Sequence, residues 1–157
     1  MRSPFTALLI TAALAASAEP AADGPLTTAE HLAHAARAAC RALGREVAVA
    51  VVDASGQTLL MSRAASVGPH NLEAARRKAY TALSTRQPTL TLGRQARSQP
   101  DTAALQYLPE LLLLGGGVPW RDASGDIAGA VGVAGGGGPE NDDACARAAV
   151  ESLPRRP

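Results

Sequence analysis

Apolar and polar positions follow two periods along the chain, which separates helical from extended segments. In the first helical segment, Leu32, Ala36 and Leu43 recur at a spacing that places them on one face. Thr27–Glu30 has the sequence of a capping box, which predicts the helix start there. Gly44 follows the last periodic residue and predicts its end.

A hairpin and a second helix are predicted next. Val47–Val52 is a short valine-rich run, typical of a buried strand, and Thr58–Arg63 is a second extended run. Asp53–Gly56 between them is rich in turn-forming residues, so the two runs are expected to pair in an antiparallel manner. Leu72–Thr85 has helical periodicity, and Asn71 is placed to cap it.

The C-terminal half predicts more strands and one further long helix. Short helices are expected at residues 89–99 and after Asp101. The other expected elements are strands at Leu111–Leu114, Val118–Arg121 and Ile127–Ala134 and a helix from Pro139 to about Leu153. Strands joined by tight turns need helices to cover their faces. The predicted fold is therefore α/β, in the α+β sense, with an antiparallel sheet of about five strands flanked by helices.

The N-terminal residues have the pattern of a secretory signal peptide. Arg2 gives a positive charge, an apolar run follows, and Ala16–Ala18 is a small-residue cleavage pattern. The apolar run is shorter than the roughly 20 residues that cross a bilayer, which disfavours a membrane anchor. We expect a signal peptide at residues 1–18, a polar leader at 19–25 and a single domain at 26–154, hence a periplasmic or secreted protein.

Composition excludes several classes of partner. The chain has 157 residues, a formal net charge of +1 and only 3% aromatic residues. This length predicts one domain. The balanced charge gives no basic excess to attract nucleic acid or an anionic membrane. The chain is long enough to bury a core.

The two cysteines, Cys40 and Cys145, lie in different predicted helices. An oxidising compartment would permit a disulfide between them, provided that the helices are neighbours with Cα atoms within about 7 Å. Otherwise both would be buried thiols that pack as small apolar side chains. The sequence leaves both possibilities open. It has no paired Cys/His spacing typical of a zinc site.

Three histidines are candidate metal ligands. His31 and His34 are three residues apart on the first helix, so they could chelate a metal or lie side by side in solvent. His70 follows a Gly-Pro pair and precedes three cations at 76–78. A neutral imidazole is a good ligand for iron, and the cations could bind carboxylates of a ligand. A solvated loop histidine beside a basic helix face is the simpler interpretation.

Gly135–Gly138 before the last helix superficially resembles a phosphate-binding loop. It lacks the Lys-Ser/Thr of a P-loop, and Glu140, Asp142 and Asp143 would repel a phosphate. The sequence also has no Gly-x-Ser-x-Gly nucleophile motif. A flexible connection between strand and helix is therefore the preferred interpretation of these glycines.

The chain resembles the GlcG/HbpS family of heme-binding or haem-degrading domains, to which the C-terminal domain of PduO-type proteins is related. The resemblance extends from about Leu26 to Leu153. It rests on the segments Val47–Asp53, Gly56, Gly68–His70, Arg77–Ala82, Gly116–Pro119, Gly125, Gly129–Gly136, Asp142 and Asp143. It implies a profilin- or roadblock-like fold, assembly into homo-oligomers, and heme binding in several members, with heme or iron handling outside the cell in some.

Three functional hypotheses follow. In the first, an exported protein binds heme for sequestration, sensing or handling, with His70 as the axial ligand and Met61 or His31 as substitutes. Arg76, Arg77 or Lys78 would then pair with the propionates. The resemblance also implies slow heme breakdown, which needs peroxide or a reductant.

The second hypothesis is an enzyme or accessory protein of small-acid or diol metabolism, with His70 as a base and Lys78 as an electrostatic stabiliser or nucleophile. The third is an oligomeric scaffold in which Lys78 pairs with a carboxylate and His70 lies at the surface.

Overall fold

The computed structural model describes residues 24–154, so the expected signal peptide at 1–18 lies outside the described residues. The elements in chain order are α1 (Pro25–Ala42), β1 (Ala48–Asp53), β2 (Thr58–Arg63), α2 (His70–Thr85), α3 (Thr89–Ala96), α4 (Pro100–Ala103), the 3-10 helix η1 (Ala104–Tyr107), β3 (Gly117–Arg121), β4 (Ile127–Ala134) and α5 (Pro139–Glu151). The α+β class predicted from the sequence is confirmed.

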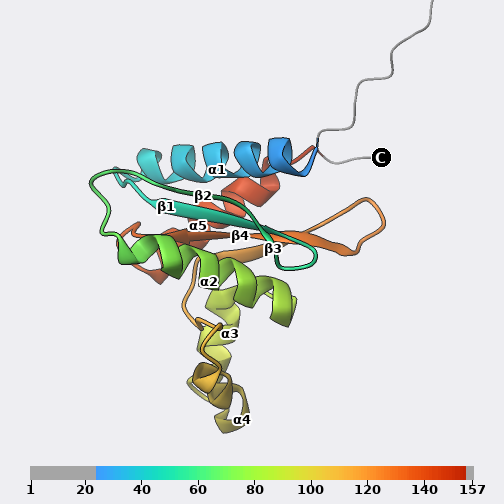
Figure 1. Cartoon of the computed structure of the whole chain (residues 1–157). Coiled ribbons are helices and arrows are strands. Elements are labelled where there is room, and N and C mark those ends of the chain that lie inside the picture. Colours follow the sequence, from blue (N-terminus) through green and yellow to red (C-terminus); the bar gives the residue numbers. More distant parts are fainter. Residues whose placement is uncertain (1–23, 155–157) are drawn as a thin grey trace, which may run out of the picture.

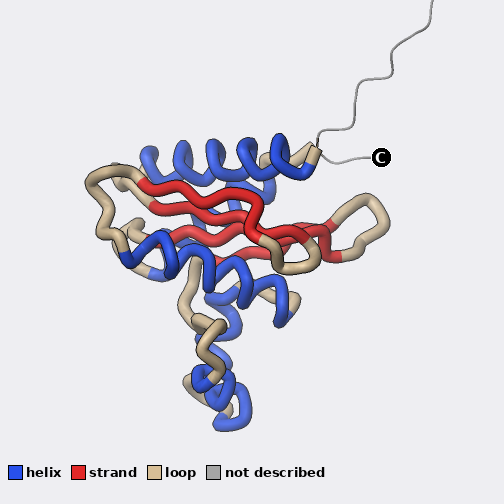
Figure 2. The backbone as a smooth tube through the Cα atoms, in the orientation of Figure 1, coloured by secondary structure: helices blue, strands red, loops and turns tan. Residues whose placement is uncertain are grey.

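A four-stranded antiparallel sheet forms the centre of the fold, with strand order β2-β1-β4-β3. Helices α1 and α5 cover one face and α2 covers the other (Figures 1 and 2). Alternate residues of β1 point to opposite faces. Val47, Val49 and Val51 therefore pack with α1 and α5, while Ala48 and Ala50 pack with α2.

Small residues on the second face allow α2 to lie almost on the sheet backbone. A Cβ added to Gly132 would stand 1.9 Å from the Ala75 carbonyl oxygen, and one added to Gly117 would stand 2.1 Å from that of Lys78. No side chain fits in these spaces. The alanine and glycine content of the sheet thus determines how closely α2 approaches.

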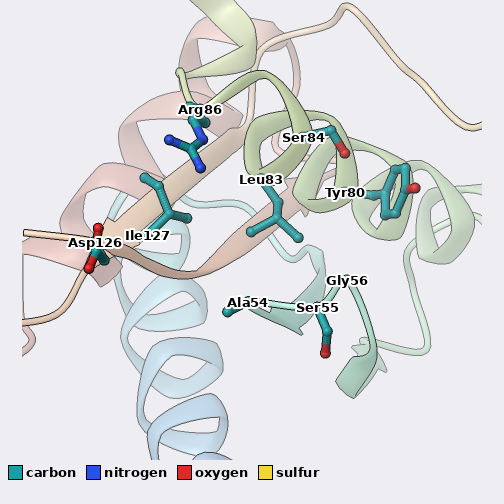
Figure 3. A pocket seen from close by; sticks show the side chains of 9 residues that line it. All are labelled: Ala54, Ser55, Gly56, Tyr80, Leu83, Ser84, Arg86, Asp126 and Ile127. Carbon is teal, nitrogen blue, oxygen red and sulfur yellow. The ribbon is translucent and has the colours of Figure 1, made fainter.

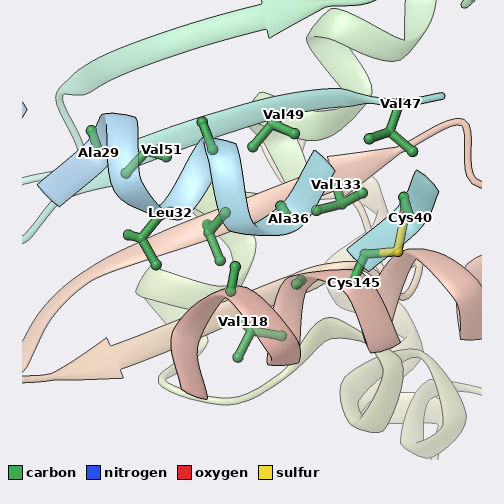
Figure 4. Packing of buried hydrophobic residues seen from close by; sticks show 14 of the residues in the cluster. Ala29, Leu32, Ala36, Cys40, Val47, Val49, Val51, Val118, Val133 and Cys145 are labelled. Carbon is green, nitrogen blue, oxygen red and sulfur yellow. A yellow bond between two sulfur atoms is a disulfide. The ribbon is translucent and has the colours of Figure 1, made fainter. Parts of the chain in front are cut away.

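Helices α1 and α5 are joined by a disulfide between Cys40 and Cys145 (Figure 4). Their Cα atoms are 5.4 Å apart, and both side chains are fully buried. The two predicted helices are therefore neighbours, which was the condition that the sequence left open. The bridge lies at the C-terminal end of α1 and in the middle of α5.

Leu111–Leu114 is not a strand, which corrects the prediction of five strands to four. Leu111 is buried, and the Leu112 amide donates a hydrogen bond to Thr81 Oγ1 on α2. The apolar run therefore packs against a helix, and its hydrogen bonds do not go to the sheet. A short apolar run has the same sequence pattern in either setting.

Two helices also begin at other residues than the sequence predicts. Helix α1 begins at Pro25 with Gly24 as the N-cap, and Thr27 makes no capping hydrogen bond. Proline is well suited to the first helical turn because its missing amide hydrogen has no partner there. Helix α2 begins at His70, so Asn71 lies inside it and its side chain donates to the Gly68 carbonyl. Gly44 ends α1 as predicted, with a φ of 70°.

The segment from α3 to η1 extends away from the sheet and its covering helices (Figure 2). We call residues 89–114 the arm. Large apolar side chains on it are exposed, including Tyr107 at 78% and Leu108 at 52%. Within residues 24–154, no helix is long and apolar enough to cross a bilayer.

Candidate functional site

A groove of about 950 Å³ lies between the N-terminal part of α1, the end of α5 and the turn that joins β3 to β4. We call it the His31 groove. Its apolar part is formed by Trp120, Ala128, Val150 and Leu153, and its polar part includes His31, Arg121 and Asp122. The remaining lining residues are Pro25, Thr27, Thr28, Ala123, Ser124 and Pro154. This volume is within the range of small-molecule sites.

His31 is oriented by the end of α5. Its Nε2 lies 3.0 Å from Ser152 Oγ and 3.2 Å from the Ser152 carbonyl oxygen. The Ser152 hydroxyl donates to the Ala149 carbonyl at 2.6 Å, so it accepts from the imidazole. Both partners of Nε2 are then acceptors, which assigns the proton to Nε2 and leaves Nδ1 with a free lone pair. Metal-binding histidines donate from one ring nitrogen to a carbonyl and bind the metal through the other, most often with Nδ1 as the donor; at His31 the roles of the two nitrogens are exchanged.

The two charged groups of the His31 groove, Arg121 and Asp122, differ in how far their hydrogen-bonding atoms are already used. Asp122 Oδ1 accepts from the backbone amides of Ser124 and Asp126, at 2.9 and 3.0 Å, so this carboxylate is held by its own turn. Among residues 24–154, the exposed Arg121 side chain donates only to the Gly125 carbonyl, at 2.7 Å. A guanidinium has five N–H donors. Arg121 therefore keeps donors for an anionic group of a ligand.

The other candidate ligands lie elsewhere. His70 is exposed at the start of α2, and its ring packs over Gly68. Met61 lies on the edge strand β2 and is 36% exposed, and His34 is exposed on α1. Neither of the two cavities that we describe in residues 24–154 is lined by any of these three side chains. The structure thus separates His31 and His70, which the sequence left as alternatives for one role.

The three consecutive cations of α2 do not form one basic face. Successive helical residues point about 100° apart, and each cation has different partners. Arg76 forms ion pairs with Glu73 and Glu110, both at 2.8 Å. These carboxylates raise the pKa of Arg76, and the Arg76 hydrogen bond lowers the pKa of Glu73. Arg77 donates to the Leu111 carbonyl at 2.5 Å.

Lys78 is buried, with 1% of its surface exposed. Its Nζ donates to Asp142 Oδ2 at 2.7 Å and to the Val133 carbonyl at 3.0 Å. Burial lowers the pKa of Lys78, and the nearby carboxylates of Asp142 and Asp143 only partly oppose this effect. Lys78 therefore does not lie beside the exposed His70 as an accessible amine. The pairing of Lys78 with a carboxylate is the one that the scaffold hypothesis describes.

Sequence reasoning missed most of the residues that line the His31 groove. Trp120 lies on β3, Val150 on α5 and Leu153 just after α5. All three are more than 85 positions from His31 in the chain, and nothing in their spacing indicates a shared site. The single tryptophan of the chain, Trp120, was the one feature of the sequence that could have indicated this groove. Over residues 24–154, no three His, Cys, Asp or Glu side chains form a group that could hold a bare metal ion.

Comparison with known proteins assigns the family. The family described as "Haem degrading protein HbpS-like" matches residues 25–151, which include every element described above. The chain belongs to the HbpS-like family. This confirms the resemblance drawn from the sequence.

Individual HbpS-like relatives cover most of the chain. HbpS itself is 36% identical and its crystal structure superposes with a TM-score of 0.76, covering 92% of this chain and 99% of that one. The crystal structure of a PduOC:heme complex is 28% identical with a TM-score of 0.71, covering 80% and 91%. An uncharacterized 15.0 kDa protein from the dhaT-dhaS intergenic region of Citrobacter freundii is 33% identical over 113 residues, covering 71% and 79%.

Proposed function

We propose that this protein binds heme, and that it does so in the His31 groove. The observation that carries the proposal is the histidine itself: of the three described histidines, only His31 lines either of the two cavities described here, and its Nδ1 is left free by the hydrogen bonds of Nε2. Family membership and the heme complex of the related PduOC support the choice of ligand.

The residues of the His31 groove match the chemistry of a porphyrin. A large planar ring requires an apolar surface, which Val150 and Leu153 provide, and the 8% of Trp120 that is exposed adds to it. Arg121 would pair with a propionate, since guanidinium binds carboxylates with two parallel hydrogen bonds. His31 would bind the heme iron. Bound heme would bring redox and oxygen chemistry, and these side chains would hold and orient it.

Handling of heme outside the cytoplasm is the role that we propose for this binding. The Cys40–Cys145 disulfide supports export, because structural disulfides persist mainly in oxidising compartments. The signal-peptide pattern of the first 18 residues agrees with it. Sequestration or sensing needs reversible binding and no catalytic group. Breakdown of heme would need an added oxidant or reductant.

We propose in addition that copies of the chain assemble through the arm. Tyr107, Leu108 and Leu114 expose apolar surface there, at 78%, 52% and 45%. Tyr107 and Leu108 are adjacent in the chain, and contiguous exposed apolar surface is typical of protein interfaces. Light scattering on the protein and on a Tyr107→Ser/Leu108→Ser variant tests this: a smaller particle for the variant supports assembly through the arm, and an unchanged mass contradicts it.

The experiment that tests heme binding is a hemin titration of the chain from Glu19 to Pro157, purified with its disulfide. Saturable appearance of a sharp Soret band at one hemin per chain is expected. Ala128→Trp, which places a large ring in the His31 groove, should abolish the band, whereas Ala54→Trp, in the other cavity, should not. Binding that survives in the Ala128→Trp variant would overturn the location. A folded protein without a saturable Soret band would overturn heme binding itself.

A further inference from the structure

A second cavity, of about 480 Å³, lies on the opposite side of the sheet from α1 and α5 (Figure 3). It is formed by the β1–β2 turn, the last turns of α2 and the start of β4. We call it the Arg86 cavity. Its lining residues are Ala54, Ser55, Gly56, Tyr80, Leu83, Ser84, Arg86, Asp126 and Ile127. It shares no residue with the His31 groove, so its role is separate from the proposed heme site.

Arg86 has an unusual backbone conformation. It follows the last residue of α2 with a φ of 57°, and within residues 24–154 it is the only residue other than glycine with a positive φ. Helices commonly end in this conformation, but with glycine, because a side chain there is strained. Strained residues are concentrated at functional sites. Here the backbone strain accompanies a guanidinium placed at the cavity wall.

The two charged groups of the Arg86 cavity are not paired with each other. Among the described residues, neither the Arg86 guanidinium nor the Asp126 carboxylate makes a hydrogen bond or an ion pair closer than 4.0 Å. Figure 3 draws the Ile127 side chain between them and the Leu83 side chain pointing toward the same space. The cavity therefore offers one positive group, one negative group and an aliphatic surface.

We propose that the Arg86 cavity binds an α-amino acid with a small aliphatic side chain. The carboxylate of the ligand would take bidentate hydrogen bonds from Arg86, and its ammonium group would donate to Asp126. The alkyl group would lie on Leu83 and Ile127. Arg86 and Asp126 are both exposed, and a site that offers one positive and one negative group favours a molecule that carries both complementary charges over one that carries a single charge.

The test uses L-valine and two analogues that each lack one charge, isovalerate and isobutylamine. Chemical shifts of the ¹⁵N-labelled protein are followed during titration with each. L-valine should shift the amides of residues 54–56 and 83–86 saturably, and each analogue should bind at least tenfold more weakly. Arg86→Gly and Asp126→Asn should each weaken valine binding at least tenfold.

The Arg86→Gly variant also controls for folding. Glycine relieves the strain of a positive φ, so this variant should unfold at a temperature equal to or above that of the parent. Loss of valine binding in a variant of undiminished stability supports the proposal. Absence of saturable shifts with valine, equal affinity for valine and isovalerate, or undiminished binding by Arg86→Gly would each overturn it. None of these outcomes depends on hemin.

Discussion

The Lys78 Nζ atom lies 2.7 Å from Asp142 Oδ2, and this buried pair joins α2 to α5 across the end of β4. The pair is almost free of water, with side-chain exposures of 2% and 6%. The other carboxylate oxygen of Asp142 accepts from the Gly136 amide at 2.7 Å, which fixes the glycine-rich loop before α5. One ion pair therefore organises a helix, a strand end and a loop.

Removing one partner of this pair should be costly. Lys78→Met leaves Asp142 buried without its counter-charge, and Asp142→Asn does the same to Lys78 while keeping an acceptor for Gly136. Each single variant should lose about 3–5 kcal/mol of unfolding free energy. The double variant should lose clearly less than the sum. Urea unfolding of the four proteins measures this coupling, and strict additivity would show that the two groups do not stabilise each other.

Stability should also depend on pH through Lys78. Because burial lowers the folded-state pKa of Lys78 below the unfolded value of about 10.5, the unfolded chain binds more protons between these two values. Stability of the parent relative to Lys78→Met should therefore rise as pH increases through this window, and level off above about 10.5. Urea unfolding of both proteins from pH 7 to 11 tests the sign. A relative stability that falls over this range would mean that the folded-state pKa is raised.

The Cys40–Cys145 disulfide should contribute substantially to stability, since it closes a loop across 105 positions of the chain. Loss of a native bridge in a small exported domain costs about 2–5 kcal/mol. The Cys40→Ala/Cys145→Ala variant should therefore melt on the order of 10 °C lower than the parent. Calorimetry in the presence and absence of a reductant provides the measurement. A parent whose Tm does not respond to full reduction of the bridge would contradict the prediction.

Gly132 should not tolerate even a methyl group. The Cβ of alanine would lie 1.9 Å from the Ala75 carbonyl oxygen. That oxygen belongs to the backbone of α2, so it cannot move aside as a flexible side chain could. Gly132→Ala should lose more than about 3 kcal/mol, the upper end of ordinary overpacking, or fail to fold. Gly24→Ala, where no atom lies within 4 Å of the added Cβ, is the control without a clash and should lose only about 1 kcal/mol, because alanine is a poorer N-cap than glycine. Equal unfolding curves for the two variants would refute the close packing of α2.

Local pattern was sufficient for much of the fold. The hairpin strand at Thr58–Arg63, the long strand at Ile127–Ala134 and the end of α1 at Gly44 were all predicted, because period and turn chemistry are local properties. The run Leu111–Leu114 was assigned wrongly because its burial depends on α2, and Thr81 takes the hydrogen bond that a neighbouring strand would take.

The candidate site could not be predicted in the same way, because it is formed by contacts between segments that are distant in the sequence. The sequence left Lys78 either as a ligand-facing cation or as the partner of a carboxylate, because its partner Asp142 is 64 positions away. His31 was only a substitute ligand in the sequence because Trp120, Val150 and Ser152 reach it only in the folded chain. Spacing along one helix shows which residues share a face, and it does not show what covers that face.

We propose that His31, and not His70, would bind the heme iron. The most direct test is to titrate His31→Ala and His70→Ala with hemin and to compare their Soret spectra with that of the parent. We predict at least a tenfold loss of affinity and a changed Soret maximum for His31→Ala, with 10 mM imidazole restoring the parent spectrum, and no change for His70→Ala. A parent-like spectrum in His31→Ala together with a lost band in His70→Ala would show that His70, and not His31, binds the iron.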